Sequence, residues 1–176
     1  MTRPPRALPS AVLGLLLAGT AAGCSGGPSG APAKGVNPAS AKVRTDVEPL
    51  QRRFLAIGQL SDPRWVGYDK DDDGGRVTVP DPDPQVRVAG LAHLPVGTAA
   101  TLTADPAYAF HPGTPGDLPP ALDGDLVRAA HWLTSPAYDR SITKSQYVGT
   151  FYLDPATDLL WFDTISPSIA DGSTPS

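Results

Sequence analysis

Proline and glycine limit this chain to short helices and strands joined by many turns. The sequence contains 21 Pro and 18 Gly, and both residue types interrupt long regular elements. Its acidic residues are 17 Asp and a single Glu, Glu48, and Asp favours helix caps and turns over helix interiors. The apolar fraction of 40% is adequate for a hydrophobic core. We therefore expect one loop-rich domain with few helices.

The first 24 residues have the order of an export signal. Arg3 and Arg6 precede an apolar run from Ala11 to Ala18, and small residues follow. The basic start holds the N-terminus inside the cell while the apolar run enters the bilayer. The run is too short to span a membrane as a permanent helix. We therefore expect this segment to be an export signal that is cleaved off.

The end of this segment resembles the lipobox of bacterial lipoprotein precursors. It reads Ala21-Ala22-Gly23-Cys24, with Ala21 at a position where Leu is usual, and Cys24 is the only cysteine. The resemblance implies that residues 1–23 are a lipoprotein signal peptide and that Cys24 carries acyl chains such as palmitate. Two or more chains give stable attachment, here to the outer face of the cytoplasmic membrane. The alternative is ordinary cleavage near Ala22, which leaves a free thiol.

Composition divides the exported part into a tether, a domain and a tail. Residues 24–43 are rich in Gly, Ser, Pro and Ala, so we expect a flexible tether. Residues 44–167 carry the apolar patterning of a single domain, and residues 168–176 are a small polar tail expected to be disordered. Without Arg3 and Arg6 the formal net charge changes from −4 to −6. No basic stripe remains, so we expect no nucleic-acid partner.

Local patterns predict the elements of the domain. Apolar residues at helical spacing predict a helix from Val47 to Gln59, with Gln51, Arg52 and Arg53 facing water. Shorter patterns bounded by Pro, Gly or Asp predict strands at 65–68, 76–79 and 85–91, a helix at 98–104 capped by Thr98, and a helix at 125–133. Residues 111–120 are rich in Pro and Gly and are expected to form a loop.

The clearest pattern is a hairpin near the C-terminus. Two apolar runs, 146–153 and 159–165, flank the turn-forming group Asp154-Pro155-Ala156-Thr157-Asp158. Apolar side chains occupy both faces of both runs, which is typical of strands that are central or covered on both sides. We predict an α+β fold: a small antiparallel sheet, with this hairpin as its core and two or three helices packed on it.

The stretch YVGTFYLDPATDLLWFDTISP, with VEPLQRRFLAIGQLSDPRWVGY upstream, resembles a group of secreted actinobacterial lipoproteins of uncharacterised function. The resemblance covers most of the predicted domain. It rests on the overall pattern of residues and not on a catalytic motif. It implies an extracytoplasmic location. It carries no functional residues to this chain.

One acidic segment has the spacing of a metal-binding loop. Asp69, Asp71 and Asp73 precede Gly74, as in the opening of a calcium loop, where alternating carboxylates converge on one hard cation. The twelfth position, which should hold a bidentate Glu, is Pro80. A calcium-stabilised surface domain is therefore one hypothesis. The alternative is a solvated acidic turn without any metal or other cofactor.

Aromatic residues near the acidic segment are candidates for ligand contact. Trp65 and Tyr68 flank it on the N-terminal side and are, of the aromatic residues, the pair best placed to be exposed. Aromatic side chains can line a groove for a sugar or a peptide, although they are more often part of a core. We expect Trp132 and Trp161 to be core residues.

No catalytic motif is present in the sequence. His93, His111 and His131 lack metal-ligand spacing, and no nucleophile elbow or phosphate-binding loop occurs. The leading hypothesis is a non-enzymatic binding or accessory module, lipid-anchored and acting on an envelope protein or glycan. The rival hypothesis is an envelope hydrolase whose Asp and His residues assemble only in the fold.

Overall fold

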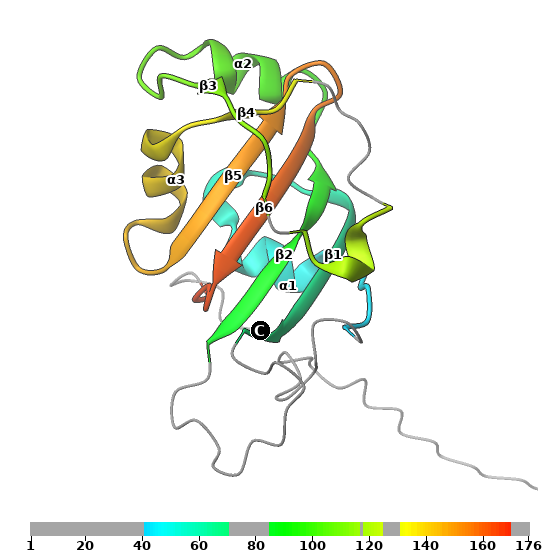
Figure 1. The fold of residues 1–176 in the computed structure, drawn as a ribbon. Helices are drawn as coiled ribbons and strands as arrows, with labels where there is room; N and C mark the ends of the chain where they lie inside the picture. Colours follow the sequence, from blue (N-terminus) through cyan, green and yellow to red (C-terminus); the bar gives the residue numbers. More distant parts are fainter. Residues whose placement is uncertain (1–40, 71–84, 117, 125–130, 170–176) are drawn as a thin grey trace, which may run out of the picture.

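The computed structural model describes residues 41–70, 85–116, 118–124 and 131–169 (Figure 1). Their central element is a six-stranded sheet, antiparallel throughout, in the order β1-β2-β6-β5-β4-β3. The strands are β1 (Ser61–Asp69), β2 (Val86–His93), β3 (His111–Pro112), β4 (Leu133–Thr134), β5 (Val148–Asp154) and β6 (Leu159–Ile165). The helices are α1 (Glu48–Arg53), α2 (Thr98–Ala104) and α3 (Pro136–Thr143), with single 3₁₀ turns η2 (Leu55–Ile57) and η3 (Pro120–Leu122). The α+β prediction is confirmed.

The C-terminal hairpin is the middle of this sheet, as predicted. β6 lies between β2 and β5, and its residues from Leu159 to Phe162 are buried on both faces. The turn is held by Asp154, whose carboxylate accepts hydrogen bonds from the Ala156 N–H (3.0 Å) and the Thr157 hydroxyl (2.9 Å). Trp161 is fully buried, and Trp132 is 8% exposed, so both are core residues as expected.

Each face of the sheet carries its own apolar cluster. The first face, here called the helix face, is covered by α1, α2 and α3, and the second, the loop face, is covered by η3 and the segment that starts at Ala41 (Figure 1). The helix-face cluster includes Phe54, Trp65, Val88, Tyr138, Phe151, Leu160 and Phe162. The loop-face cluster includes Ala41, Val66, Tyr68, Leu91, Leu122, Trp132 and Trp161. Two residues of the predicted tether, Ala41 and Val43, thus pack against the domain.

The first helix is shorter than its apolar spacing predicts. α1 ends at Arg53, Phe54 has φ −114° and ψ 38°, and the chain continues as the η2 turn. The break lets Phe54 insert into the core, where its ring lies 5.7 Å from the ring of Phe151 and 5.2 Å from that of Phe162. Such aromatic packing stabilises the core beyond simple area burial, so tertiary contact overrides the helical period here.

The partner of β1 is β2, in an antiparallel ladder that pairs Trp65 with Gly90 and Asp69 with Val86. The Lys70 N–H donates to the Gln85 carbonyl at 2.7 Å and closes this connection. Residues 71–74 of the acidic segment and the predicted strand at 76–79 lie outside the described residues. β1 extends beyond the predicted 65–68 at both ends, whereas β2 begins one residue later and ends two residues later than the predicted 85–91.

Helix α2 has the predicted bounds but a different cap. The side chain of Thr98 makes no capping hydrogen bond, and the residue before the helix is Gly97, with φ 80°. The carboxylate of Asp158, in the β5–β6 turn, accepts from the N–H groups of Gly97 (2.8 Å) and Ala99 (2.9 Å). The helix start is therefore completed from a different element.

The predicted helix at 125–133 is wrong at its end, because Leu133 and Thr134 form strand β4 and pair with β5; residues 125–130 lie outside the described residues. The sequence analysis also missed α3 and the short strand β3 in the expected loop at 111–120. Ser135 caps α3 by accepting from the Tyr138 N–H at 3.1 Å, and Pro136 is the first helical residue. Pro136 thus occupies the first helical position, where its missing N–H and restricted φ are tolerated.

Candidate functional site: a cleft around Arg53

The predicted lipid and metal positions are covered only in part by the structure. Cys24, Asp71 and Asp73 lie outside the described residues. Asp69 is the last residue of β1 and is half-buried. Within ranges 41–70, 85–116, 118–124 and 131–169, no group of three His, Cys, Asp or Glu residues is placed to hold a metal ion.

The expectation that Trp65 and Tyr68 form an exposed pair is wrong. Each side chain is only 3% exposed, and the two lie on opposite faces of the sheet. Residues three apart in a strand point in opposite directions. The indole N–H of Trp65 donates to the Asp46 carbonyl at 3.0 Å, and the Arg44 guanidinium lies 4.1 Å from the ring centroid. These contacts bind the N-terminal segment to the sheet.

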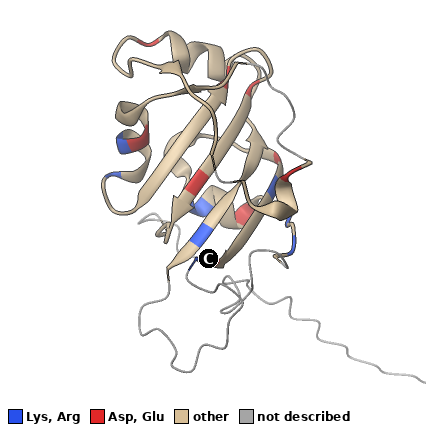
Figure 2. Ribbon diagram, in the orientation of Figure 1, with Lys and Arg blue, Asp and Glu red and all other residues tan. Residues whose placement is uncertain are grey.

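Tyr68 belongs to a polar cluster on the loop face. Arg87 donates two hydrogen bonds to the Asp163 carboxylate, at 2.9 and 2.6 Å, and one to the Tyr68 hydroxyl at 3.1 Å. Figure 2 shows the positive and negative positions side by side on β2 and β6. The bidentate carboxylate raises the pKa of Arg87, and burial raises the pKa of Tyr68. These paired groups connect three strands, which is a structural role.

The three histidines lie at different strand ends, and each is exposed. His93 ends β2 and His111 begins β3, while His131 precedes the buried Trp132. The hydrolase hypothesis requires a hollow that holds Asp together with one of these histidines. None of the three lines either of the hollows described next.

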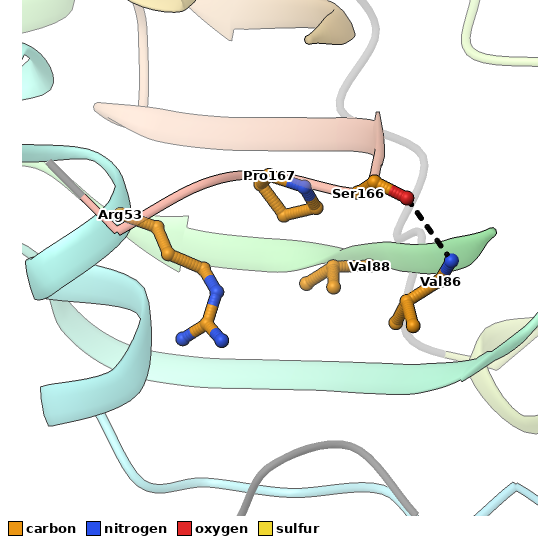
Figure 3. A pocket seen from close by; sticks show the side chains of 5 residues that line it. All are labelled: Arg53, Val86, Val88, Ser166 and Pro167. Carbon is orange, nitrogen blue, oxygen red and sulfur yellow. Dashed lines mark hydrogen bonds between the residues drawn. The ribbon is translucent and has the colours of Figure 1, made fainter. Parts of the chain in front are cut away.

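A hollow of about 210 Å³ lies between α1 and the start of β2 on the helix face. Figure 3 shows Arg53 reaching from α1 toward β2, with Pro167 between it and Ser166. The Ser166 hydroxyl accepts from the Val86 N–H at 3.3 Å, which holds the chain after β6 against β2. Val86 and Val88 supply the apolar floor. We call this the strand hollow.

A second hollow, of about 240 Å³, also borders Arg53, and we call it the helix hollow. Its walls come from η2, from the end of α3, from the connection to β5 and from the chain after β6. The lining residues are Arg53, Leu55, Ala56, Ile142, Lys144, Gln146, Tyr147 and Ser168. The two hollows share Arg53, and we call them together the Arg53 cleft.

Arg53 is a half-buried cation without a carboxylate partner among the described residues. Within the described part of the chain, its one hydrogen bond runs from Nη1 to the Pro49 carbonyl, at 2.9 Å. Burial lowers the pKa of Arg53, and the neighbouring charges of Arg52 and Arg44 lower it further, while the charge of the Glu48 carboxylate acts in the opposite direction. Both neighbours have their own partners, because Arg52 pairs with Glu48 and Arg44 with Asp46.

The helix hollow holds a further group that suits an anion. Lys144 adds a second cation at the exposed rim. The hydroxyl of Tyr147 is buried with no hydrogen-bond partner in the described structure, and burial raises its pKa to about 12, so the group keeps its proton. The Arg53 guanidinium and the Lys144 ammonium are both charged donors, whereas the Tyr147 hydroxyl is closed off from the hollow. The cleft can therefore bind an anionic group by charge-assisted hydrogen bonds.

Sequence reasoning missed this cleft because we expected Arg53 to face water. The available signal was its position, three residues after Leu50 and four after Pro49, both of which are buried. A residue at that spacing lies beside the apolar stripe of a helix. Its partners in the cleft come from residues 86–88, 142–147 and 166–168, and only the fold brings these together.

Comparisons with protein-family models, with curated proteins and with solved structures found no match for this chain. Among the residues that the structure describes, no helix has the length and apolar character needed to cross a bilayer.

Proposed function

We propose that this chain is a lipid-anchored extracytoplasmic protein whose domain binds an anionic group of another envelope component in the Arg53 cleft. The support for anchoring is the order of residues 1–24, which ends in the single cysteine, Cys24. In this proposal the lipid is the contact with the membrane, and the partner is an envelope protein or glycan that carries the anion.

The observation that carries the proposal is the half-buried Arg53 without a carboxylate partner among the described residues. Withdrawing a guanidinium from water costs free energy unless a partner compensates for it. A ligand anion that enters either hollow offsets this cost. Conversely, without a ligand the domain gains little stability from this charge.

The groups that line the cleft favour binding over catalysis. Its polar lining consists of cations, hydroxyls and one amide. General acid–base catalysis works best with a group that titrates near the operating pH. Arg53 and Lys144 are instead suited to hold an anion in place. We therefore propose a binding module.

The test uses mature protein extracted from bacterial membranes in detergent, with an intact mass that includes acyl chains on Cys24. Thermal unfolding is measured in sodium acetate or sodium phosphate against sodium chloride of equal ionic strength. We expect one or both of these anions to raise the Tm of the wild-type protein, because a ligand that binds only the folded state stabilises it. The Arg53→Gln variant should lose this gain.

The matched control is Arg52→Gln, one residue earlier on the same helix, where the arginine pairs with Glu48 and lines neither hollow. The Arg52→Gln variant should keep the increase in Tm that the anions cause in the wild-type protein. In chloride alone, Arg53→Gln should unfold no earlier than the wild-type protein. An equal response to anions in the two variants, or no response in the wild-type protein, would refute the proposed site. A mature mass without acyl chains would refute the anchor.

A further inference from the structure

We infer that the anionic group is the C-terminal carboxylate of a peptide chain that ends in a small apolar residue, bound in the helix hollow. This inference rests on the proposed function and narrows it. The helix hollow is the better candidate of the two because it combines two cations with apolar walls and the unpaired amide of Gln146.

The geometry of the cation favours a carboxylate. A guanidinium is planar and presents parallel N–H donors that match the two oxygens of a carboxylate. In Arg53, Nη1 is occupied by the Pro49 carbonyl, and the remaining N–H donors have no acceptor among the described residues. Lys144 follows α3 with φ 50° in the left-handed region. Its ammonium supplies a second, more mobile charge at the rim.

The apolar walls favour a small hydrocarbon group beside that carboxylate. Leu55, Ala56 and Ile142 line the same hollow, and Leu55 is 49% exposed. The volume of about 240 Å³ is below the range of roughly 300–1,000 Å³ that is typical of sites for whole small molecules. A hollow of this size suits the end of a chain, with one or two residues inside and the rest in solvent.

One polar side chain can pair with the peptide backbone. Gln146 lies exposed at the rim, and its side-chain amide, which is both a donor and an acceptor, has no partner among the described residues. Tyr147 is part of the same wall, but its unpaired hydroxyl is closed off from solvent and therefore from a ligand in the hollow. An extended peptide presents an N–H and a carbonyl for each residue, so the Gln146 amide can pair with the backbone of a terminal dipeptide.

The experiment is calorimetric titration of the detergent-solubilised mature protein with four probes: N-acetyl-Ala-Ala with a free carboxylate, the same dipeptide as its C-terminal amide, sodium acetate and sodium phosphate. We expect the free-acid dipeptide to bind at least about tenfold more tightly than its amide, because only the acid pairs with the guanidinium. It should also bind more tightly than acetate. Gln146→Ala should weaken dipeptide binding and leave acetate binding unchanged.

The Arg53→Lys variant keeps the positive charge but removes the planar pair of N–H donors that a guanidinium offers to a carboxylate. It should lose most of the preference for the free-acid dipeptide over phosphate, since an ammonium acts as a point charge. Equal affinity for acid and amide, or tighter binding of acetate or phosphate than of the dipeptide acid, would overturn the peptide inference. If acetate or phosphate still bound through Arg53, the proposed anion site would stand. If no probe bound, both the peptide inference and the proposed anion site would be refuted.

Discussion

At the scale of single residues, Gly90 marks a place where the sheet has no room for a side chain. Gly90 pairs with Trp65 across the β1–β2 ladder. A Cβ atom on Gly90 would overlap the Arg64 carbonyl oxygen and would lie 2.5 Å from the Cβ of Trp65. We predict that Gly90→Ala lowers the free energy of unfolding by about 1–3 kcal/mol, as overpacking does in other cores. Urea unfolding followed by tryptophan fluorescence measures this change.

Gly116→Ala is the control, because nothing lies within 4 Å of a Cβ atom built at Gly116. Its stability should remain within about 0.5 kcal/mol of the wild-type value, as for most surface substitutions. Similar losses of unfolding free energy in the two variants would mean that glycine is needed at position 90 for its backbone freedom, and not because of the contact with Trp65.

At the scale of elements, α2 depends on a side chain from the β5–β6 turn. The N–H groups of Gly97 and Ala99 donate to the Asp158 carboxylate, and these bonds lower the pKa of Asp158. Asp158 has φ 54°, so Asp158→Gly keeps a conformation that the backbone tolerates and removes only the cap. We predict faster amide hydrogen exchange in α2 and a lower Tm for this variant.

Asp158→Asn retains one acceptor oxygen and tolerates positive φ, so its exchange rates should lie between those of the wild-type protein and the glycine variant. The effect should be confined to α2 and the adjacent turn. Unchanged exchange at Ala99 in Asp158→Gly would show that the helix does not need this cap.

At the scale of the whole molecule, Asp139 makes stability depend on pH. Burial raises the pKa of Asp139 from 3.8 to about 6, although the carboxylate accepts from the Phe151 N–H at 2.9 Å. The folded state therefore binds more protons than the unfolded state between about pH 4 and pH 6. The stabilising contribution of Asp139 to the free energy of unfolding is fully present below pH 4 and is lost as the pH rises through 6.

We predict that Asp139→Asn removes this slope, because the amide oxygen still accepts from Phe151 and no charge is buried. At pH 7 the variant should be more stable than the wild-type protein by on the order of 1 kcal/mol, once solvent screening is allowed for. Denaturant unfolding at pH 4, 5, 6 and 7 gives the difference directly. Asp123→Asn, at an exposed position, is the control, and a matching pH profile in the two variants would contradict the assignment.

The sequence by itself determined the parts whose information is local. The hairpin of β5 and β6 follows from two apolar runs around an Asp-Pro turn. The general α+β class could be inferred for the same reason. In each case neighbouring residues specify the backbone without help from distant ones.

Only the tertiary structure decided the features that depend on distant contacts. Ser135-Pro136 can end one helix or begin another, and the choice for α3 is made where Tyr138 packs against Phe151, with its ring centroid 6.4 Å away. Trp65 and Tyr68 are buried because separate layers cover the two faces of the sheet. Arg53 becomes a candidate binding residue because β2, α3 and the chain after β6 enclose it. Burial and charge pairing are properties of the packed chain, so no local pattern determines them.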